Sequence, residues 1–215
     1  MATQYVMLTL GLVQTNCYIL GDEASGSAVV IDPADDAPAI LKELERRGWT
    51  ARRIVATHGH FDHVLAADDL RRATGAPFHL HEADLPLLQA MQESGRWFGL
   101  ALPPGPEPDG FVRPGERIAV DGIGLEVRFT PGHTRGHVSY VLAGERMVFS
   151  GDCLFQGSIG RTDLPGGDHE RLMRSILEEL LPLGDDYTVA PGHGPLTSIG
   201  RERRGNPFLL DYAAS

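Results

Sequence analysis

The stretch His58-Gly59-His60-Phe61-Asp62-His63 decides how the rest of the chain is interpreted. It places three imidazoles and one carboxylate within six residues. The apolar run at residues 53–56 before it predicts a strand, and the pattern over residues 62–72 predicts a helix. Side chains two residues apart on extended backbone point the same way, and a helix start can bring further ligands to the same cleft. Because imidazoles with a carboxylate bind zinc, iron and related ions and leave room for water, the stretch predicts a metal site.

Three later strand ends carry the same kinds of side chain next to glycine. The predicted strands at residues 125–129, 147–149 and 187–190 are followed by Pro131-Gly132-His133, Gly151-Asp152 and Pro191-Gly192-His193. Glycine allows the backbone to approach a site closely. A single histidine of this kind is usually an ordinary loop residue, but three parallel cases predict that His133, Asp152 and His193 join the first four ligands.

Strand and helix patterns extend outward from these motifs. Short runs rich in Val, Ile and Tyr predict strands at residues 5–10, 17–20, 28–31, 53–56, 78–80, 125–129, 138–142, 147–149 and 187–190. Helical periodicity predicts helices at residues 37–47, 62–72, 82–94 and 169–181. The Pro/Gly-rich residues 103–108 predict a surface loop and not a domain linker. We therefore expect an α/β fold with sheets between helices, in a single domain at residues 1–215.

The composition narrows the classes of partner. A formal net charge of −10 over 215 residues argues against nucleic-acid binding, which requires a basic surface. No run approaches the roughly 18–20 apolar residues that span a bilayer, and the N-terminus has no secretory signal, so we expect no membrane partner. Two cysteines, Cys17 and Cys153, are too few for a disulfide framework and fit a reducing compartment. We therefore expect a cytoplasmic protein.

The order H-x-H-x-D-H, then H, then D, then H, resembles the metal signature of the metallo-β-lactamase superfamily, and all seven positions are filled. The resemblance implies that family's four-layer αβ/βα sandwich, with the site along one edge of the two sheets. It implies one metal ion held by His58, His60 and His133, a second held by Asp62, His63 and His193, and Asp152 as the bridging carboxylate.

Other segments resemble particular branches of that family. A resemblance to the type II glyoxalase and persulfide dioxygenase groups is carried by Thr15-Asn16-Cys17-Tyr18, residues 157–163 and Asn206-Pro207-Phe208. Residues 155–209 look most like a short bacterial type II glyoxalase-like group, which lacks the C-terminal helical domain that supplies glutathione contacts in full-size glyoxalases. Enzymes that open β-lactams commonly have a cysteine where Asp152 stands. The nuclease branch carries a large inserted domain, for which 215 residues leave no room.

By this resemblance we expect a metal-dependent hydrolase that cleaves a thioester such as S-lactoylglutathione. A bound divalent ion lowers the pKa of water from about 15.7 toward 7, and the resulting hydroxide attacks the thioester carbonyl. The expected cofactor is Zn²⁺, as one or two ions, with iron or manganese as alternatives. Asp62 and Asp152 are the predicted catalytic carboxylates. Arg161 is the predicted contact for an anionic small-molecule substrate such as a glutathione thioester.

Two other functions stay open. A mononuclear iron persulfide dioxygenase would use His58, His133 and Asp152, a set of two histidines and one carboxylate nested within the seven positions. A non-enzymatic metal-binding scaffold is the third hypothesis, which is disfavoured because structural zinc sites are closed and favour cysteine. Outside the signature, we expect His137 to pack in the core, with support of a metal ligand as the alternative.

Overall fold

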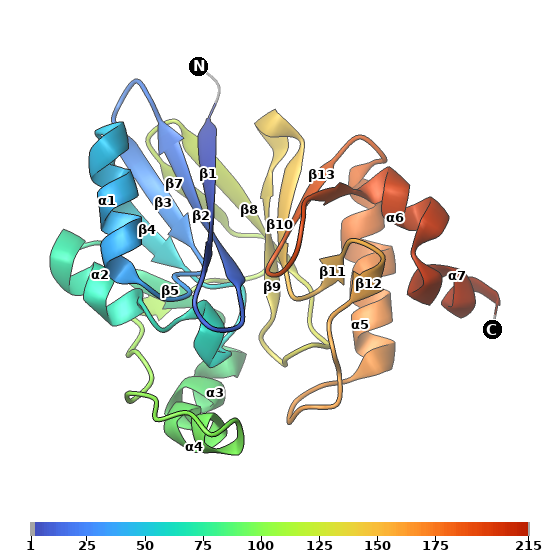
Figure 1. Ribbon diagram of the computed structural model, residues 1–215. Coiled ribbons are helices and arrows are strands. Elements are labelled where there is room, and N and C mark those ends of the chain that lie inside the picture. Colours follow the sequence, from blue (N-terminus) through green and yellow to red (C-terminus); the bar gives the residue numbers. More distant parts are fainter. Residues whose placement is uncertain (1–2, 215) are drawn as a thin grey trace.

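Two six-stranded sheets pack face to face in the computed structural model, which describes residues 3–214. The first has the order β1 (Gln4–Leu10), β2 (Thr15–Asp22), β3 (Ser27–Ile31), β4 (Thr50–Val55), β5 (Phe78–Leu80), β6 (Gly110–Phe111). The second has the order β14 (Thr197–Ser198), β13 (Thr188–Pro191), β10 (Met147–Gly151), β9 (Val138–Leu142), β8 (Ile123–Phe129), β7 (Arg117–Val120). A small ribbon of β11 (Leu154–Phe155) and β12 (Ser158–Ile159) lies beside the second sheet (Figure 1).

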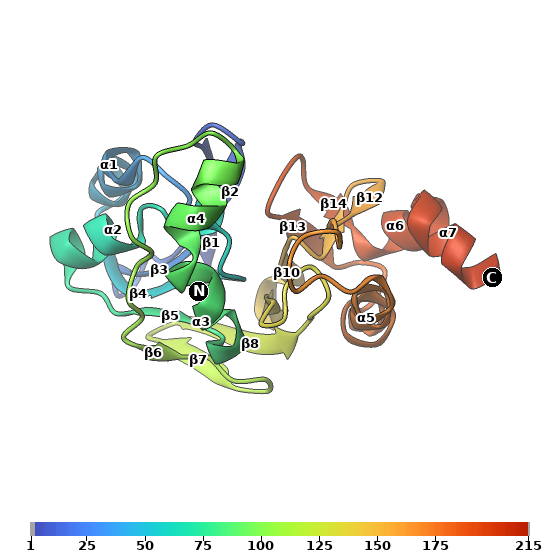
Figure 2. The ribbon, with the colours of Figure 1, turned by 90° about the horizontal axis from the view of Figure 1, so that it is seen from below.

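Helices cover the outer faces of both sheets. The first sheet is covered by α1 (Ala37–Arg47) and α2 (Ala67–Thr74), and the second by α5 (His169–Ser175), which continues into a π-helical turn at Ile176–Leu180 (Figure 1). Two short helices, α3 (Leu85–Gln89) and α4 (Met91–Trp97), lie below the edge where the sheets meet (Figure 2). The helices α6 (Ile199–Gly205) and α7 (Pro207–Ala214) close the described chain. This four-layer αβ/βα arrangement confirms the predicted fold class.

Strand β2 shows why the sheets are buried on both faces. All eight of its residues are buried. Cys17 and Ile19 pack in the cluster under α1 and α2, whereas Tyr18 and Leu20 pack in the cluster between the sheets. Successive side chains of a strand point to opposite faces, so one apolar run supplies two cores. No helix of residues 3–214 is long and apolar enough to cross a bilayer.

Two predicted helices are wrong in detail, and both lie next to the metal signature. The helix expected at residues 62–72 is a 3₁₀ turn at Phe61–His63 followed by α2, which begins only at Ala67. The helix expected at residues 82–94 is a 3₁₀ turn at Glu82–Asp84 followed by the separate helices α3 and α4. In each case a side chain turns inward to the site, so regular helical periodicity is interrupted. By contrast, α1 has the predicted bounds, with Asp36 as N-cap and left-handed Gly48 after its end.

Candidate metal centre

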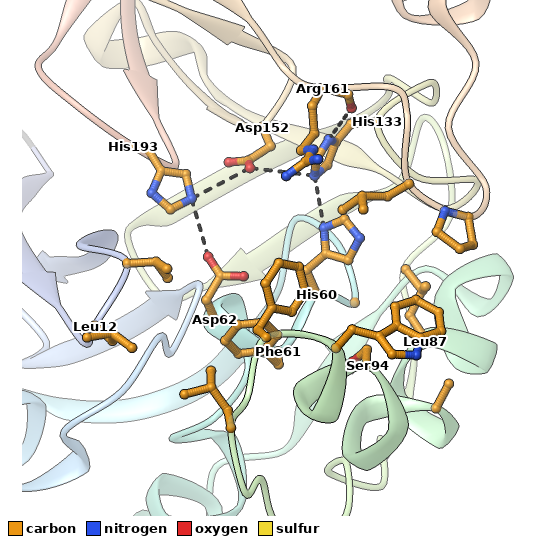
Figure 3. A pocket seen from close by; sticks show the side chains of 18 residues that line it. Leu12, His60, Phe61, Asp62, Leu87, Ser94, His133, Asp152, Arg161 and His193 are labelled. Atoms are coloured by element: carbon orange, nitrogen blue, oxygen red, sulfur yellow. Dashed lines mark hydrogen bonds and ion pairs between the residues drawn. The ribbon is translucent and has the colours of Figure 1, made fainter.

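The seven side chains of the signature meet at the edge between the sheets, close to the ends of β4, β10 and β13. Figure 3 shows those that face the cavity, namely His60, Asp62, His133, Asp152 and His193. His58 and His60 follow β4, and Asp62 and His63 lie on the 3₁₀ turn. His133 lies in the loop between β8 and β9. Asp152 comes directly after β10, and His193 after β13. Three overlapping groups have ligand atoms within 4.8 Å of one another, namely His58–His60–His133, His58–His63–Asp152 and Asp62–His63–His193. The first and third are the ligand sets that the sequence resemblance implied.

The first group is three imidazoles, two of which have tautomers fixed by hydrogen bonds. His60 Nδ1 lies 3.0 Å from His58 Nε2 and 2.9 Å from His133 Nε2. His133 Nδ1 is 2.7 Å from the carbonyl oxygen of Arg161, which can only accept, so Nδ1 carries the proton. His58 Nδ1 donates to the Thr57 hydroxyl, whose own proton goes to Asp32. The Nε2 atoms of His58 and His133 are therefore lone-pair donors that point at a common centre.

The second group combines carboxylates with His63 and His193. Asp62 Oδ2 lies 3.4 Å from His63 Nε2 and 3.3 Å from His193 Nε2. The two oxygens of Asp152 face different neighbours, because Oδ1 is 3.4 Å from His63 Nε2 whereas Oδ2 is 3.5 Å from His133 Nε2. Asp152 thus lies between the two groups, where a bridging carboxylate is expected.

Unpaired buried atoms show that the residues fit a cation. Within residues 3–214, His63 Nε2 and Asp152 Oδ1 are buried polar atoms without a hydrogen-bond partner. A buried group left unpaired costs about 1–3 kcal/mol, and more when it is charged. A divalent ion between these atoms would satisfy both, and the mix of imidazole and carboxylate ligands is the set that divalent transition metals prefer. The cluster therefore indicates a divalent metal site.

The pKa values agree with this ligand set. Burial and the neighbouring His133 lower the pKa of His60 to about 3, and burial followed by the charge of His63 lowers the pKa of His58 well below 6.5. Burial would raise the pKa of Asp62, but His63 and the hydrogen bond from His193 lower it to about 2. These groups are thus in the deprotonated state that metal binding requires.

His63 behaves differently because carboxylates surround it. Burial would lower its pKa, but the negative charges of Asp62, Asp152 and Asp32 raise the pKa well above 6.5. Without a metal, His63 therefore holds a second proton among the acids. A bound cation would take the place of that proton and balance the same negative charge.

Asp32 is a supporting residue that the sequence analysis missed. Its carboxylate accepts hydrogen bonds from His63 Nδ1 at 3.0 Å and from the backbone and hydroxyl of Thr57 at 2.6 and 2.9 Å. It directs His63 Nε2 toward the centre and fixes the loop that carries His58. Such partners of metal-binding histidines orient the ring and set its tautomer. The signal was available, because Asp32 follows strand β3 as Asp152 follows β10.

Asp84 joins two loops of the site in the same way. Its buried carboxylate accepts from the backbone N–H of Gly59 at 3.0 Å, from that of Gly136 at 2.6 Å and from the Thr134 hydroxyl at 2.7 Å. It therefore holds the His58–His60 loop against the His133 loop. No local pattern marks Asp84, since its three partners lie 25 to 52 residues away.

His137 packs in the core as expected, but it also supports a ligand. Its ring is fully buried and lies 5.2 Å from that of His58. Its Nε2 accepts the backbone N–H of Asp152 at 3.0 Å, which places the proton on Nδ1, facing the Thr130 hydroxyl. The preference for packing alone was therefore incomplete. His137 fixes the backbone from which the Asp152 carboxylate projects.

The His193 loop is held from the opposite sheet. Asn16 Nδ2 donates to the carbonyls of Pro191 and Gly194 at 3.0 and 2.8 Å, and the Tyr18 hydroxyl donates to Pro191 at 2.8 Å. Thr15 donates to Asp62 Oδ2 at 2.7 Å. This accounts for the Thr15-Asn16-Cys17-Tyr18 segment, whose polar members face the site. Cys17 and Cys153 are buried in the two outer cores, away from it.

Arg161 lies beside the centre, with its side chain half exposed. Its carbonyl accepts from His133, a contact that sequence reasoning did not anticipate. Its guanidinium donates two hydrogen bonds of 2.8 Å to the carboxylate of Asp163. The side chain is thus placed at the site but already has an anionic partner.

Known proteins resemble this chain along most of its length. The Metallo-beta-lactamase superfamily matches residues 10–193. A hydroxyacylglutathione hydrolase, GloC, from Haemophilus influenzae is 40% identical over 198 residues, covering 91% of this chain and 93% of that protein. The crystal structure of BLEG-1 B3 metallo-beta-lactamase has a TM-score of 0.90 and 41% identity, covering 96% of this chain and 99% of that one. TTHA1623 in a di-iron-bound form has a TM-score of 0.87 and 42% identity, covering 95% and 100%. The chain belongs to the metallo-beta-lactamase superfamily.

Proposed function

We propose that this protein is a metal-dependent hydrolase that cleaves a thioester, of the type represented by S-lactoylglutathione. The observation that carries the proposal is the cluster of candidate ligand groups around Asp152, several of whose members line a cavity. The 40% identity to a hydroxyacylglutathione hydrolase supports the thioester as the bond that is cleaved.

Zinc is the proposed metal, held by His58, His60 and His133 in one group and by Asp62, His63 and His193 in the other, with Asp152 between them. When bound, such ions supply hydroxide at neutral pH and polarise a carbonyl group. A thiolate is a stable leaving group, so no strong acid is needed to protonate it.

The chain's own residues orient this chemistry. Asp62 is fixed by the Thr15 hydroxyl at 2.7 Å, and its low pKa keeps it ionised, so it can orient a water by accepting a hydrogen bond from it. Asp152 is fixed through its backbone by His137. The His193 side chain is 29% exposed, more than that of Asp62, and lies at the cavity wall, where a substrate carbonyl can approach. Arg161 is the proposed contact for a substrate carboxylate.

The test is metal analysis of the purified protein together with a thioester assay. We expect stoichiometric zinc, release of glutathione from S-lactoylglutathione, loss of turnover on chelation and recovery with Zn²⁺. A fully metal-loaded protein that leaves a panel of thioesters intact would contradict the proposal. Because a B3 metallo-beta-lactamase is 41% identical to this chain, the panel also includes a β-lactam.

A second candidate is the iron-dependent persulfide dioxygenase. One observation favours it: His133 Nε2 lies 3.5 Å from Asp152 Oδ2, as a mononuclear set with His58 would require. The related TTHA1623 binds iron in a di-iron form, which supports iron as the metal but not a mononuclear centre. Oxygen uptake by the iron-loaded protein with glutathione persulfide, in the absence of thioester cleavage, would favour this candidate over the hydrolase.

A further inference from the structure

The cavity beside the metal centre has a strongly apolar wall. It encloses about 410 Å³, within the range of small-molecule sites. On one side lie ligand residues such as Asp62, Asp152 and His193, and on the other lie hydrophobic and aromatic side chains (Figure 3). They include Leu12, Val13, Phe61, Leu87, Trp97 and Phe98.

Four of these side chains are exposed to an unusual degree. The exposed fractions are 79% for Leu12, 62% for Trp97, 52% for Phe98 and 45% for Val13. Leu12 and Val13 come from the turn between β1 and β2, whereas Trp97 and Phe98 come from the end of α4. Single exposed apolar residues are ordinary, but a group gathered from two distant segments around one cavity marks a binding surface.

Part of the apolar wall is a stripe along α3 and α4. Leu87, Ala90, Ser94 and Trp97 follow the spacing of one helix face along α3 and α4, and all four line the cavity. In a globular protein such a stripe normally faces the core. Here it faces the metal centre instead.

The adjacent face of the same segment anchors it. Leu88 and Met91 are 2% and 1% exposed and belong to the core under the first sheet. Gly95 packs so closely on Leu102 that an added Cβ would lie 2.6 Å from it. The stripe is therefore held in place by its own core contacts, with its cavity face free to bind.

Apart from the proposed metal ions, the cavity has one positively charged side chain among its lining residues. Arg161 is the only Lys or Arg among the lining residues, and both of its outward hydrogen bonds go to Asp163. A small polar acyl group such as lactoyl would leave most of the wall in contact with water. Apolar surface gains free energy only when another apolar surface covers it.

We propose that the substrate carries a bulky apolar group, aryl or medium-chain alkyl, which packs on the stripe of Leu87, Ala90 and Trp97 while its thioester faces the metal centre. This inference rests on the proposed thioester hydrolysis and names its substrate class. The apolar group can belong to the acyl or to the thiol half of the thioester, and the experiment separates these two.

The kinetic test uses two matched pairs of substrates. Propionyl and 3-phenylpropionyl thioesters of N-acetylcysteamine vary the acyl half, and acetyl thioesters of ethanethiol and 2-phenylethanethiol vary the thiol half. The phenyl group is remote from the carbonyl in both pairs, so intrinsic reactivity changes little. We expect kcat/KM to rise at least about tenfold with the phenyl group in one pair. Equal values within both pairs would overturn the inference, even with thioesters hydrolysed.

Trp97→Ala with Phe208→Ala as control ties the preference to the wall. Both aromatic side chains are exposed, at 62% and 44%, so neither change threatens folding. Only Trp97 lines the cavity. We expect Trp97→Ala to abolish most of the phenyl preference through KM, because kcat/KM falls far more for the phenyl substrates than for the small ones. Phe208→Ala should behave as the parent protein. Loss of the preference in the control alone would refute the assignment of the wall.

Binding can be measured without turnover. Trp97 is exposed, whereas Trp49, the other tryptophan, is 7% exposed and packs beside Gly21. Titration of the zinc-loaded protein with 3-phenylpropionate should change the fluorescence of Trp97 at concentrations where propionate does not, and Trp97→Phe should remove the change. If no thioester is cleaved, the proposed function fails, and this titration still decides whether the cavity binds apolar groups.

Discussion

Replacement of Asp32 by Asn tests how the buried carboxylate controls His63. The Thr57 N–H donates to Oδ1, and the Thr57 hydroxyl and His63 Nδ1 both donate to Oδ2. An asparagine that keeps the first contact must place its NH₂ group against His63 Nδ1. His63 then has to accept there, which moves its proton to Nε2, the atom that faces Asp62 and Asp152.

The flipped orientation of the asparagine amide is also unfavourable. It would point its NH₂ at the buried Thr57 N–H, and an unsatisfied buried donor costs about 1–3 kcal/mol. Loss of the partner of a metal-binding histidine weakens metal affinity about 10–100-fold. We therefore expect the more weakly held ion of Asp32→Asn to bind about 10–100-fold less tightly, or about 1.4–2.8 kcal/mol.

The assay is competition with a chelator of known affinity, with the two metal equivalents resolved. Asp69→Asn is the matched control, because Asp69 is exposed and its salt bridge is to Arg72, away from the site. The Thr57 hydroxyl also loses its acceptor at Oδ2, so we expect His58, whose Nδ1 donates to that hydroxyl, to bind its ion less tightly as well. Two metal equivalents bound by Asp32→Asn as tightly as by the parent would refute the reasoning on the tautomer.

Three further results are expected. In Gly192→Ala the new Cβ would lie 2.3 Å from Asp152 Oδ1 and 2.7 Å from His63 Cε1, so we expect turnover to fall about 100-fold. The control Gly144→Ala has open space around the new Cβ and should be neutral. Steady-state kinetics and metal content are measured for both variants. In the metal-free protein the raised pKa of His63 contributes stability that is complete below about pH 6.5 and is lost as pH rises through the folded value. The thermal unfolding midpoint of the chelated protein should therefore decrease as the pH rises above about 6.5, and His63→Gln should make this decrease smaller. A midpoint that increases with pH in this range would contradict the reasoning. Arg161→Ala should raise KM for thioesters with a carboxylate about tenfold at unchanged kcat, with exposed Arg146→Ala as control, and unchanged kinetics would remove Arg161 as a substrate contact.

The sequence predicts most of the candidate site because its residues stand at strand ends. His58, His133, Asp152 and His193 each follow an apolar run, and parallel or sandwiched strands bring such ends to one edge. The structure brings all seven side chains together, and their metal binding stays a prediction. The single domain at residues 1–215 and the cytoplasmic location also stay predictions.

What the sequence could not show depends on long-range contacts. Asp84 interrupts a helical pattern at residues 82–94 because three hydrogen bonds from two distant loops hold its side chain inward. The residues near Asp84 in the sequence do not indicate these partners. The apolar stripe was similarly hidden, since Leu87 and Trp97 have the spacing of core residues. Only the tertiary arrangement reveals that this face meets the metal centre.

The contacts of Asn16 and Tyr18 with the His193 loop have a consequence for assembly. They run from the first sheet to the end of β13 in the second, across the boundary between the two halves. Residues up to His63 supply four of the seven ligands, and the later half supplies His133, Asp152 and His193. Neither half alone can therefore build a complete ion-binding set. We therefore expect metal binding to require both halves, so that an ion held at the proposed centre would oppose separation of the two sheets.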